Sequence, residues 1–216
     1  MQDRIDLVRA TQKKAKLLHK FQEKILMPLY EKCGFIRIGA DEEVNDKMSL
    51  INYEKTCVVS RRFQQEDAEN VSSLVKRNFI EVNSKDYGIK AMQKLADRYN
   101  AVKVASIAEH SHMYVFEWKG QIVGVGAISS YWGSKTESIL LTIFVLPELH
   151  GKGIGRKIIN TLEQDEFYVR ANRIEIPASV TATEFYRKFG YDYKNGVKEL
   201  DGEGHYRLEK FKEAGL

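Results

Sequence analysis

The feature that most constrains the fold of this chain is a strand–turn–helix in its second half. Residues 137–145 read ESILLTIFV, an almost continuously apolar run typical of a central strand buried on both faces. A glycine-rich turn follows at 150–155, and a helix extends from there to about Ala171. The predicted buried face of that helix consists of Ile154, Ile158, Ile159 and Leu162. Such a unit needs a sheet with helices packed on its faces.

The chain from residue 56 onward alternates between helical and strand patterns. Helices are predicted over 65–82, 89–99 and 182–189, and further strands over 58–63, 112–118, 121–130, 173–177, 190–194 and 204–210. Lys119-Gly120 joins two of these strands as a hairpin turn. The order β, α, α, β, β, β, α, β, α, β, β predicts an α/β or α+β domain over 56–216, with a mixed, mostly antiparallel central sheet flanked by helices.

Residues 1–55 form a separate appendage in this interpretation. A helix is predicted over 11–32, followed by strands over 33–39 and 47–55 that are joined by the acidic turn 40–43. LYEKCGF at 29–35 is similar to FYRKFGY at 185–191, which indicates either a truncated repeat of the main domain or chance. We expect the appendage to pack on the main domain, and a homodimer is the alternative.

Composition excludes several classes of protein. The net charge of +4 comes from Lys and Arg spread along the chain, so we expect no nucleic-acid partner. Cys33 and Cys57 form no CxxC and are interpreted as free thiols. No secretory signal or membrane-length apolar run is found, which favours a cytoplasmic protein without a membrane partner. His110 and His112 lack a third ligand, so we expect no metal site.

The turn at 150–155, HGKGIG, has the properties of an anion site. Glycines leave backbone N–H groups open at a helix N-terminus, where the helix dipole favours negative charge. Lys152, Arg156 and Lys157 add positive charge. A P-loop would need GxxxxGK followed by Ser or Thr, and a dinucleotide turn would need Gly where Arg156 stands. A phosphate or pyrophosphate site is therefore favoured over a merely connecting turn.

These residues resemble the GNAT superfamily of acyl-CoA N-acyltransferases over about 56–212. The turn is similar to the family's Gln/Arg-xx-Gly-x-Gly/Ala signature, with His150 in place of Gln or Arg. Residues 179–191, SVTATEFYRKFGY, are similar to a second family motif, with Ser179 in place of Asn. The resemblance implies acetyl-CoA as acyl donor, bound by Phe144, Val145, His150, Gly151, Lys152, Gly153, Ile154, Gly155, Arg156, Ser179, Thr183 and Phe185.

The resemblance also implies a mechanism. The pantetheine arm of the donor would lie between splayed strands at 139–145 and 173–178, and an amine would attack the thioester directly. Tyr186 is the candidate acid for the departing sulfur, and the N–H near Val145 is the candidate oxyanion donor. Glu137 is the candidate general base.

The resulting hypothesis is an N-acetyltransferase that acts on a primary amine of a small molecule or peptide. The alternative is a non-catalytic acyl-CoA-binding or regulatory module with the same fold. The acceptor is not identified, because it would be selected by segments around 80–112 and 195–204 that carry no readable pattern.

Overall fold

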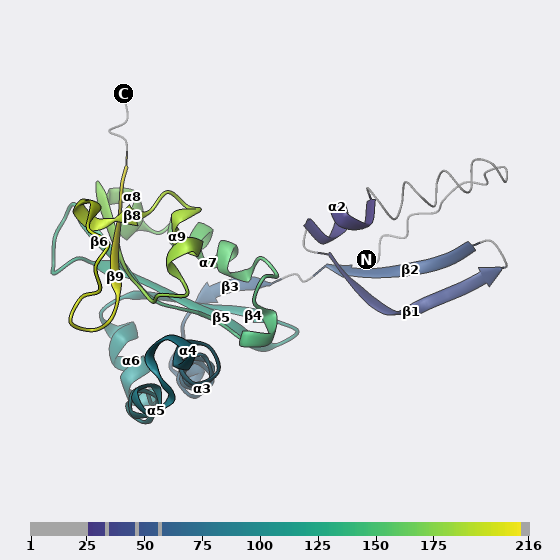
Figure 1. Ribbon diagram of the computed structural model, residues 1–216, viewed down its shortest axis with the longest axis horizontal. Coiled ribbons are helices and arrows are strands. Elements are labelled where there is room, and N and C mark those ends of the chain that lie inside the picture. The colour runs from purple at the N-terminus through teal and green to yellow at the C-terminus, as the bar shows by residue number, and fades with distance from the viewer. Residues whose placement is uncertain (1–25, 33–34, 46–47, 56–57, 213–216) are drawn as a thin grey trace. The chain divides into compact units, whose positions relative to one another are not determined.

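The computed structural model describes residues 26–32, 35–45, 48–55 and 58–212. The chain divides into two compact units, Met1–Cys57 and Val58–Leu216, which are described separately (Figure 1). None of the described helices is both long and apolar enough to cross a lipid bilayer.

The described part of the N-terminal unit is a short helix followed by a hairpin. Helix α2 spans Met27–Lys32, and the antiparallel strands β1 and β2 span Phe35–Asn45 and Met48–Lys55. The predicted acidic turn at 40–43 is wrong, because these residues lie inside β1, where the register shifts between Ile38 and Glu42. The predicted helix at 11–25 lies outside the described residues.

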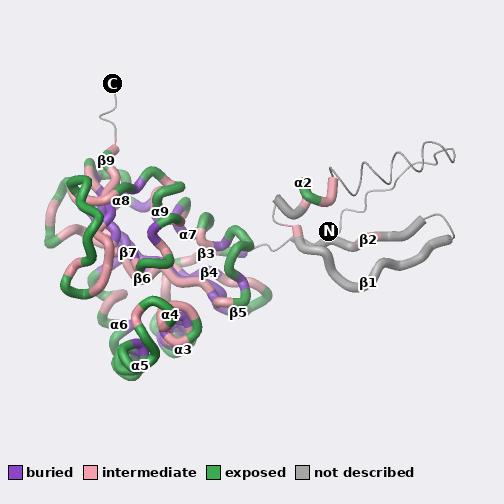
Figure 2. The backbone as a smooth tube through the Cα atoms, viewed as in Figure 1, coloured by how far each residue is buried: buried purple, intermediate pink, exposed green. Residues whose placement is uncertain are grey.

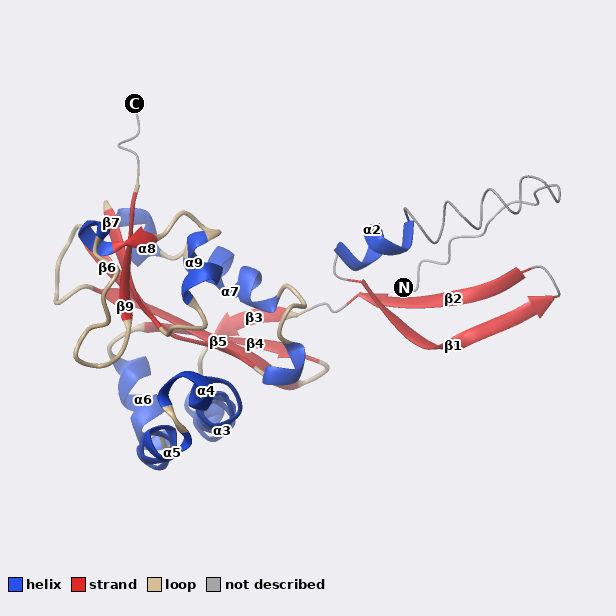
Figure 3. Cartoon of the chain, viewed as in Figure 1, coloured by secondary structure: helices blue, strands red, loops and turns tan. Residues whose placement is uncertain are grey.

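The second unit contains a seven-stranded sheet in the order β3-β4-β5-β6-β7-β9-β8 (Figure 3). Only β6 and β7 are parallel neighbours, so the predicted mixed, mostly antiparallel sheet is confirmed. The strands are β3 (Val59–Arg62), β4 (His112–Trp118), β5 (Gln121–Ser130), β6 (Glu137–Val145), β7 (Arg173–Ala178), β8 (Asp192–Tyr193) and β9 (Tyr206–Phe211).

Helices cover both faces of this sheet (Figure 1). One face carries α3 (Ala68–Asn78), α4 (Ser84–Tyr87), α5 (Ile89–Arg98) and α6 (Ala101–Glu109), and the other carries α7 (Ile154–Leu162), α8 (Glu166–Arg170) and α9 (Thr183–Arg187). Short 3-10 turns at Gln65–Asp67, Pro147–Leu149 and Lys194–Gly196 and a π-helical turn at Phe79–Asn83 complete the unit.

Two helix predictions need correction. No helix was predicted between 99 and 112, yet α6 fills 101–109, and Asn100 caps it by accepting a hydrogen bond from Lys103 N at 3.0 Å. The predicted single helix to Ala171 breaks after Leu162. The Asp165 carboxylate accepts from Phe167 N at 2.8 Å, which starts the separate helix α8.

The core lies between the sheet and its helices (Figure 2). The predicted buried face of α7 is confirmed, because Ile154, Ile158, Ile159 and Leu162 are all at most 3% exposed. The helix lies very close to β5 at Gly126. A Cβ placed on that glycine would lie only 2.4 Å from Ile158 Cγ2. Gly126 therefore sets how closely α7, and the turn that precedes it, approach the sheet.

We expect Gly126→Val to lower the free energy of unfolding by about 1–3 kcal/mol, because α7 would be pushed away from β5. Chemical denaturation measures this loss. Gly202→Val is the matched control, since a Cβ there meets no atom within 4 Å. Equal stability of the two variants would contradict the close packing of α7 on β5.

Candidate active site

The central feature of the site is a fork between β6 and β7. The two strands pair only at Glu137↔Arg173, Ser138↔Ile174 and Ile139↔Glu175. Beyond Ile139 they separate, although β7 stays paired with β9 as far as Ala178. Pro177 has no N–H to donate, which is compatible with a strand that loses one neighbour. The predicted splay of 139–145 from 173–178 is confirmed.

A bulge bends β6 inside the fork. Leu141 pairs with Ala127 and Phe144 with Val125, so two residues of β6 lie opposite Gly126 alone. Thr142, one of these two, has a φ of 53°, a left-handed conformation that is strained for a β-branched residue. Tyr99 Oη donates to Thr142 Oγ1 at 3.5 Å. The bulge therefore bends β6 in the part of the strand that no longer pairs with β7.

The end of β6 is fixed at the carbonyl of Val145. Asn78 Nδ2 donates to this oxygen at 2.9 Å, and His150 Nε2 donates to it at 3.0 Å. These contacts fix the orientation of the peptide that follows Val145. They also give His150 a role within the protein, since its ring ties the glycine-rich turn back to the strand.

The glycine-rich turn presents a group of unused donors. The N–H groups of Gly151, Gly153, Ile154, Gly155 and Arg156 find no acceptor in the part of the chain that the structure describes. Gly151 and Gly153 have φ values of 78° and 83°, in the region that favours glycine. Together with the positive end of the α7 dipole, these donors form a site for an anion such as a phosphate.

Gly155 serves a different purpose from the other two glycines. A Cβ at this position would lie 3.0 Å from Phe185 Cζ. The missing side chain therefore allows α9 to pack directly against the first turn of α7. Phe185 packs at this contact, and its role in binding the donor stays a prediction.

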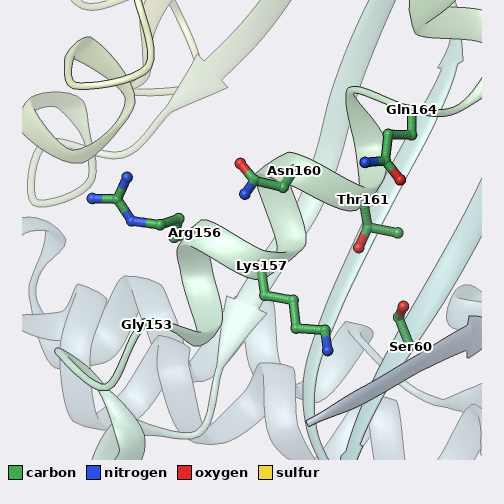
Figure 4. A pocket seen from close by; sticks show the side chains of 7 residues that line it. All are labelled: Ser60, Gly153, Arg156, Lys157, Asn160, Thr161 and Gln164. Atoms are coloured by element: carbon green, nitrogen blue, oxygen red, sulfur yellow. The ribbon is translucent and has the colours of Figure 1, made fainter. Parts of the chain in front are cut away.

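The basic side chains next to the turn point in different directions. Lys157 points toward β3 and donates to the Val58 carbonyl, while Arg156 points away from it (Figure 4). The Arg156 guanidinium lies 5.5 Å from the centre of the Phe189 ring. On the β3 side of α7 there is a shallow cavity of about 390 Å³, lined by Ser60, Gly153, Arg156, Lys157, Asn160, Thr161 and Gln164. This lining is polar and basic.

Tyr186 lies in α9, and its side chain is part of the buried core. Its side chain is 5% exposed, and burial raises the pKa of its phenol well above the ordinary value. The hydroxyl makes no hydrogen bond to any described residue, yet it is not among the fully enclosed polar atoms that lack a partner. The Tyr186 phenol therefore keeps its proton at neutral pH, and its hydroxyl is not used by any described residue.

The other residues predicted to bind the donor differ in whether their side chains already contact other parts of the protein. Thr183 Oγ1 donates to the Ser179 carbonyl at 3.0 Å, so this hydroxyl is already used inside the α9 turn. Ser179 is half-buried, and its hydroxyl makes no hydrogen bond to a described residue. Phe144 packs edge-to-face on Phe79, with ring centres 5.6 Å apart. Phe144 thus belongs to an aromatic wall on the α3 side of β6.

Glu137 lies at the base of the fork, where β6 and β7 are still paired. Its carboxylate lies 3.3 Å from Arg173 Nη1. The same arginine bonds Glu175, which is completely buried on β7 and also accepts from Lys194 Nζ at 2.9 Å and Arg207 Nε at 2.8 Å. A charged network thus holds the two strands together just before they separate.

The sequence did not predict the residues of α4 that bond the segments after β7 and before β9. Asp86 in α4 accepts from Thr181 N at 3.1 Å, and Tyr87 Oη accepts from Val180 N at 3.1 Å and donates to the Gly204 carbonyl at 2.9 Å. Neither residue had a sequence signal. For Glu175 there was one, since this charged residue stands within the otherwise apolar run IEIPA at 174–178.

Comparisons with known proteins agree with this geometry. PaiA N-acetyltransferase from Thermoplasma acidophilum, solved in complex with coenzyme A, has a TM-score of 0.63 at 14% identity, covering 72% of this chain and 99% of that one. A GNAT family acetyltransferase from Brucella melitensis, solved in complex with acetyl-CoA, has a TM-score of 0.53 at 21% identity, covering 74% and 92%. A GCN5-related N-acetyltransferase from Rhodopseudomonas palustris has a TM-score of 0.59 at 20% identity, covering 71% and 95%.

These similarities show the fold. A search of curated proteins found no match. The model of one family, described as the acetyltransferase (GNAT) domain, matches residues 81–210, which is more than half of the chain. The chain therefore belongs to the GNAT acetyltransferase family.

Proposed function

We propose that the second unit transfers an acetyl group from acetyl-CoA to a primary amine of a small molecule or peptide. The observation that carries this proposal is the fork between β6 and β7, because β6 leads into the turn with the unused N–H groups of Gly151 and of residues 153–156. An extended thioester arm fits the fork, and a pyrophosphate fits the turn. The polar cavity beside α7 is suited to the nucleotide end of the donor.

The chain's own residues account for the steps that the reaction needs. Acetyl-CoA supplies a thioester whose carbonyl carbon the neutral amine attacks. The N–H of Val145 is the proposed donor to the oxyanion, and the carbonyl of the same residue is fixed by Asn78 and His150. When the C–S bond breaks, Tyr186 gives its proton to the sulfur, and the proton that the amine loses restores the phenol through solvent.

The reaction also needs a base for the amine. Glu137 stays the predicted base, although its carboxylate forms an ion pair with Arg173. The same engagement favours the second candidate function, a GNAT-fold module that binds acyl-CoA without turnover. A cytoplasmic location also stays a prediction.

The donor site can be tested by titrating the protein with acetyl-CoA in a calorimeter, with free CoA and ATP as comparisons. We expect Gly153→Val to weaken acetyl-CoA binding at least about tenfold, a loss of about 1.4 kcal/mol. A β-branched residue is strained at its φ of 83° and would turn the N–H groups away from the phosphates.

Gly133→Val is the matched control, because Gly133 has a φ of 78° and a Cβ there also meets no atom within 4 Å. It carries similar backbone strain outside the site, so its affinity should equal that of the wild type. Equal affinities of both variants would mean that the turn is a connection only. Absence of binding to the wild-type protein would remove the proposed donor.

A further inference from the structure

The N-terminal unit repeats a piece of the second unit in sequence. Residues 29–35, LYEKCGF, are similar to residues 185–191, FYRKFGY. The tripeptide at 53–55 then follows at the same distance, within one residue, as the tripeptide at 208–210, and both end in Glu-Lys. On sequence alone, chance explains this similarity as well as duplication does.

Strand pairing supplies an independent comparison. Aligning the two segments through this repeat makes two residue pairs equivalent: Ile36↔Glu54 with Asp192↔Glu209, and Arg37↔Tyr53 with Tyr193↔Leu208. The register of β1 on β2 is therefore the register of β8 on β9. Because each strand pair could have adopted other registers, this agreement favours duplication over chance.

The preceding helices agree as well. The same alignment makes Met27 equivalent to Thr183, and these are the first residues of α2 and α9. The described part of the N-terminal unit thus has the order, the helix start and the strand register of α9–β8–β9, the element that closes the acetyltransferase domain.

The duplicated hairpin differs from its counterpart at one edge. In the second unit, β9 lies between β8 and β7 and is paired on both sides. Its equivalent β2 pairs with β1, and no other described strand lies on its second side. A two-stranded hairpin is at best marginally stable alone in water. The outer edge of β2 therefore lacks, among the described strands, a partner equivalent to β7, which pairs with β9 in the second unit.

The described sheet edges are protected to different degrees. Strand β1 contains Arg37 and three consecutive acidic residues at 41–43, and its register is shifted twice by extra residues. Strand β3 has four residues, of which two are arginines, and β8 has only two residues. Charges, bulges and shortness are the usual means by which proteins prevent edge pairing. Residues 48–53 of β2, MSLINY, have no charge, no proline and no bulge.

We propose that the outer edge of β2 pairs with the β2 edge of a second copy of this chain, so that two hairpins form one continuous sheet across a two-fold axis. The partner is a second copy because, of the described edges, β2 is the one without protection, and a symmetric dimer brings like edges together. The duplicated helix–hairpin is then a dimerisation element. This proposal is independent of the acetyl transfer proposed above.

The test uses the full chain with Cys33→Ser and Cys57→Ser, first by sedimentation at micromolar concentration. Single cysteines are then introduced on β2 by Leu50→Cys, Ile51→Cys or Asn52→Cys. The controls on β1 are Ile36→Cys and Ile38→Cys. A disulfide needs Cα atoms about 4.4–6.8 Å apart, so only a residue at or next to the two-fold axis can form one efficiently.

We expect a dimer in sedimentation, and a covalent dimer whose yield is highest at one β2 position and low at both β1 positions. Lysine at that β2 position should shift the protein to monomer while acetyl-CoA binding stays unchanged. A monomeric wild-type protein would overturn the proposal. So would a dimer that cross-links equally through β1 and β2, or one that the lysine leaves intact.

Discussion

Replacing Tyr186 with phenylalanine is expected to lower kcat by about 10²- to 10⁴-fold, the usual contribution of a general acid. Acetyl-CoA affinity should stay unchanged, because the ring is retained and its hydroxyl bonds no described residue. Burial raises the pKa of this phenol, so it stays protonated at neutral and mildly alkaline pH. The wild-type rate should therefore show no alkaline decline caused by loss of this proton.

Tyr191→Phe is the matched control for this experiment. Tyr191 is also buried, burial also raises the pKa of its phenol, and its enclosed hydroxyl has no hydrogen-bond partner among the residues that the structure describes. Turnover should survive this change. If Tyr186→Phe is as active as Tyr191→Phe, Tyr186 is not the acid. If the wild-type protein binds acetyl-CoA but acetylates no member of a broad amine panel, the non-catalytic module is the better description.

Glu175→Gln should cost about 3–5 kcal/mol of folding free energy, which is typical when one partner of a buried ion pair is removed. The Glu175 side chain is fully buried and bonds three cations, Arg173, Lys194 and Arg207. An amide carries no charge to balance these cations, and Lys194 has no other carboxylate partner among the described residues, whereas Arg173 keeps Glu209 and Arg207 keeps Asp201. Chemical denaturation at neutral pH measures the loss. Glu137→Gln is the control, because its carboxylate is 37% exposed and contacts the same arginine. It should cost about 0–1 kcal/mol.

The pH dependence of this loss has a defined sign. Burial by itself would raise the pKa of Glu175, but hydrogen bonds from Lys194, Arg173 and Arg207 outweigh it, and the net pKa is lowered. A carboxyl with a lowered folded pKa stabilises the protein above its unfolded pKa, and this stability is lost as the pH falls through the folded value. The difference between wild type and Glu175→Gln should therefore shrink in acid. A difference that is constant with pH would contradict an ionised Glu175.

The sequence was most informative where one pattern determined the local structure. The apolar run at 137–145 and the glycines after it predicted β6, the turn and α7, because hydrophobic burial and positive φ leave few alternatives. The expectation that β6 is buried on both faces held only in part, since its last five residues are half-buried. These residues follow the point where β7 leaves.

What the sequence did not predict depends on contacts between distant segments. The bulge at Thr142 exists because of how β5 and β6 align, and the bridge from Tyr87 to Gly204 joins residues far apart in the chain. The acidic run at 41–43 looked like a turn, but a bulge accommodates it within β1. Local propensity carries no information about such pairings.

The contact between Gly155 and Phe185 has a consequence for how a donor is selected. Because the Phe185 ring lies where a side chain of residue 155 would be, α7, which follows the glycine-rich turn, and α9, which bears Tyr186, are held at a set spacing. If the donor is anchored by its phosphates and protonated at its sulfur, as proposed above, this spacing limits the length of the arm that joins the two groups. A carrier with a shorter or longer arm would present its sulfur out of reach of Tyr186, so the donor would be chosen by its length before any of its atoms is recognised chemically.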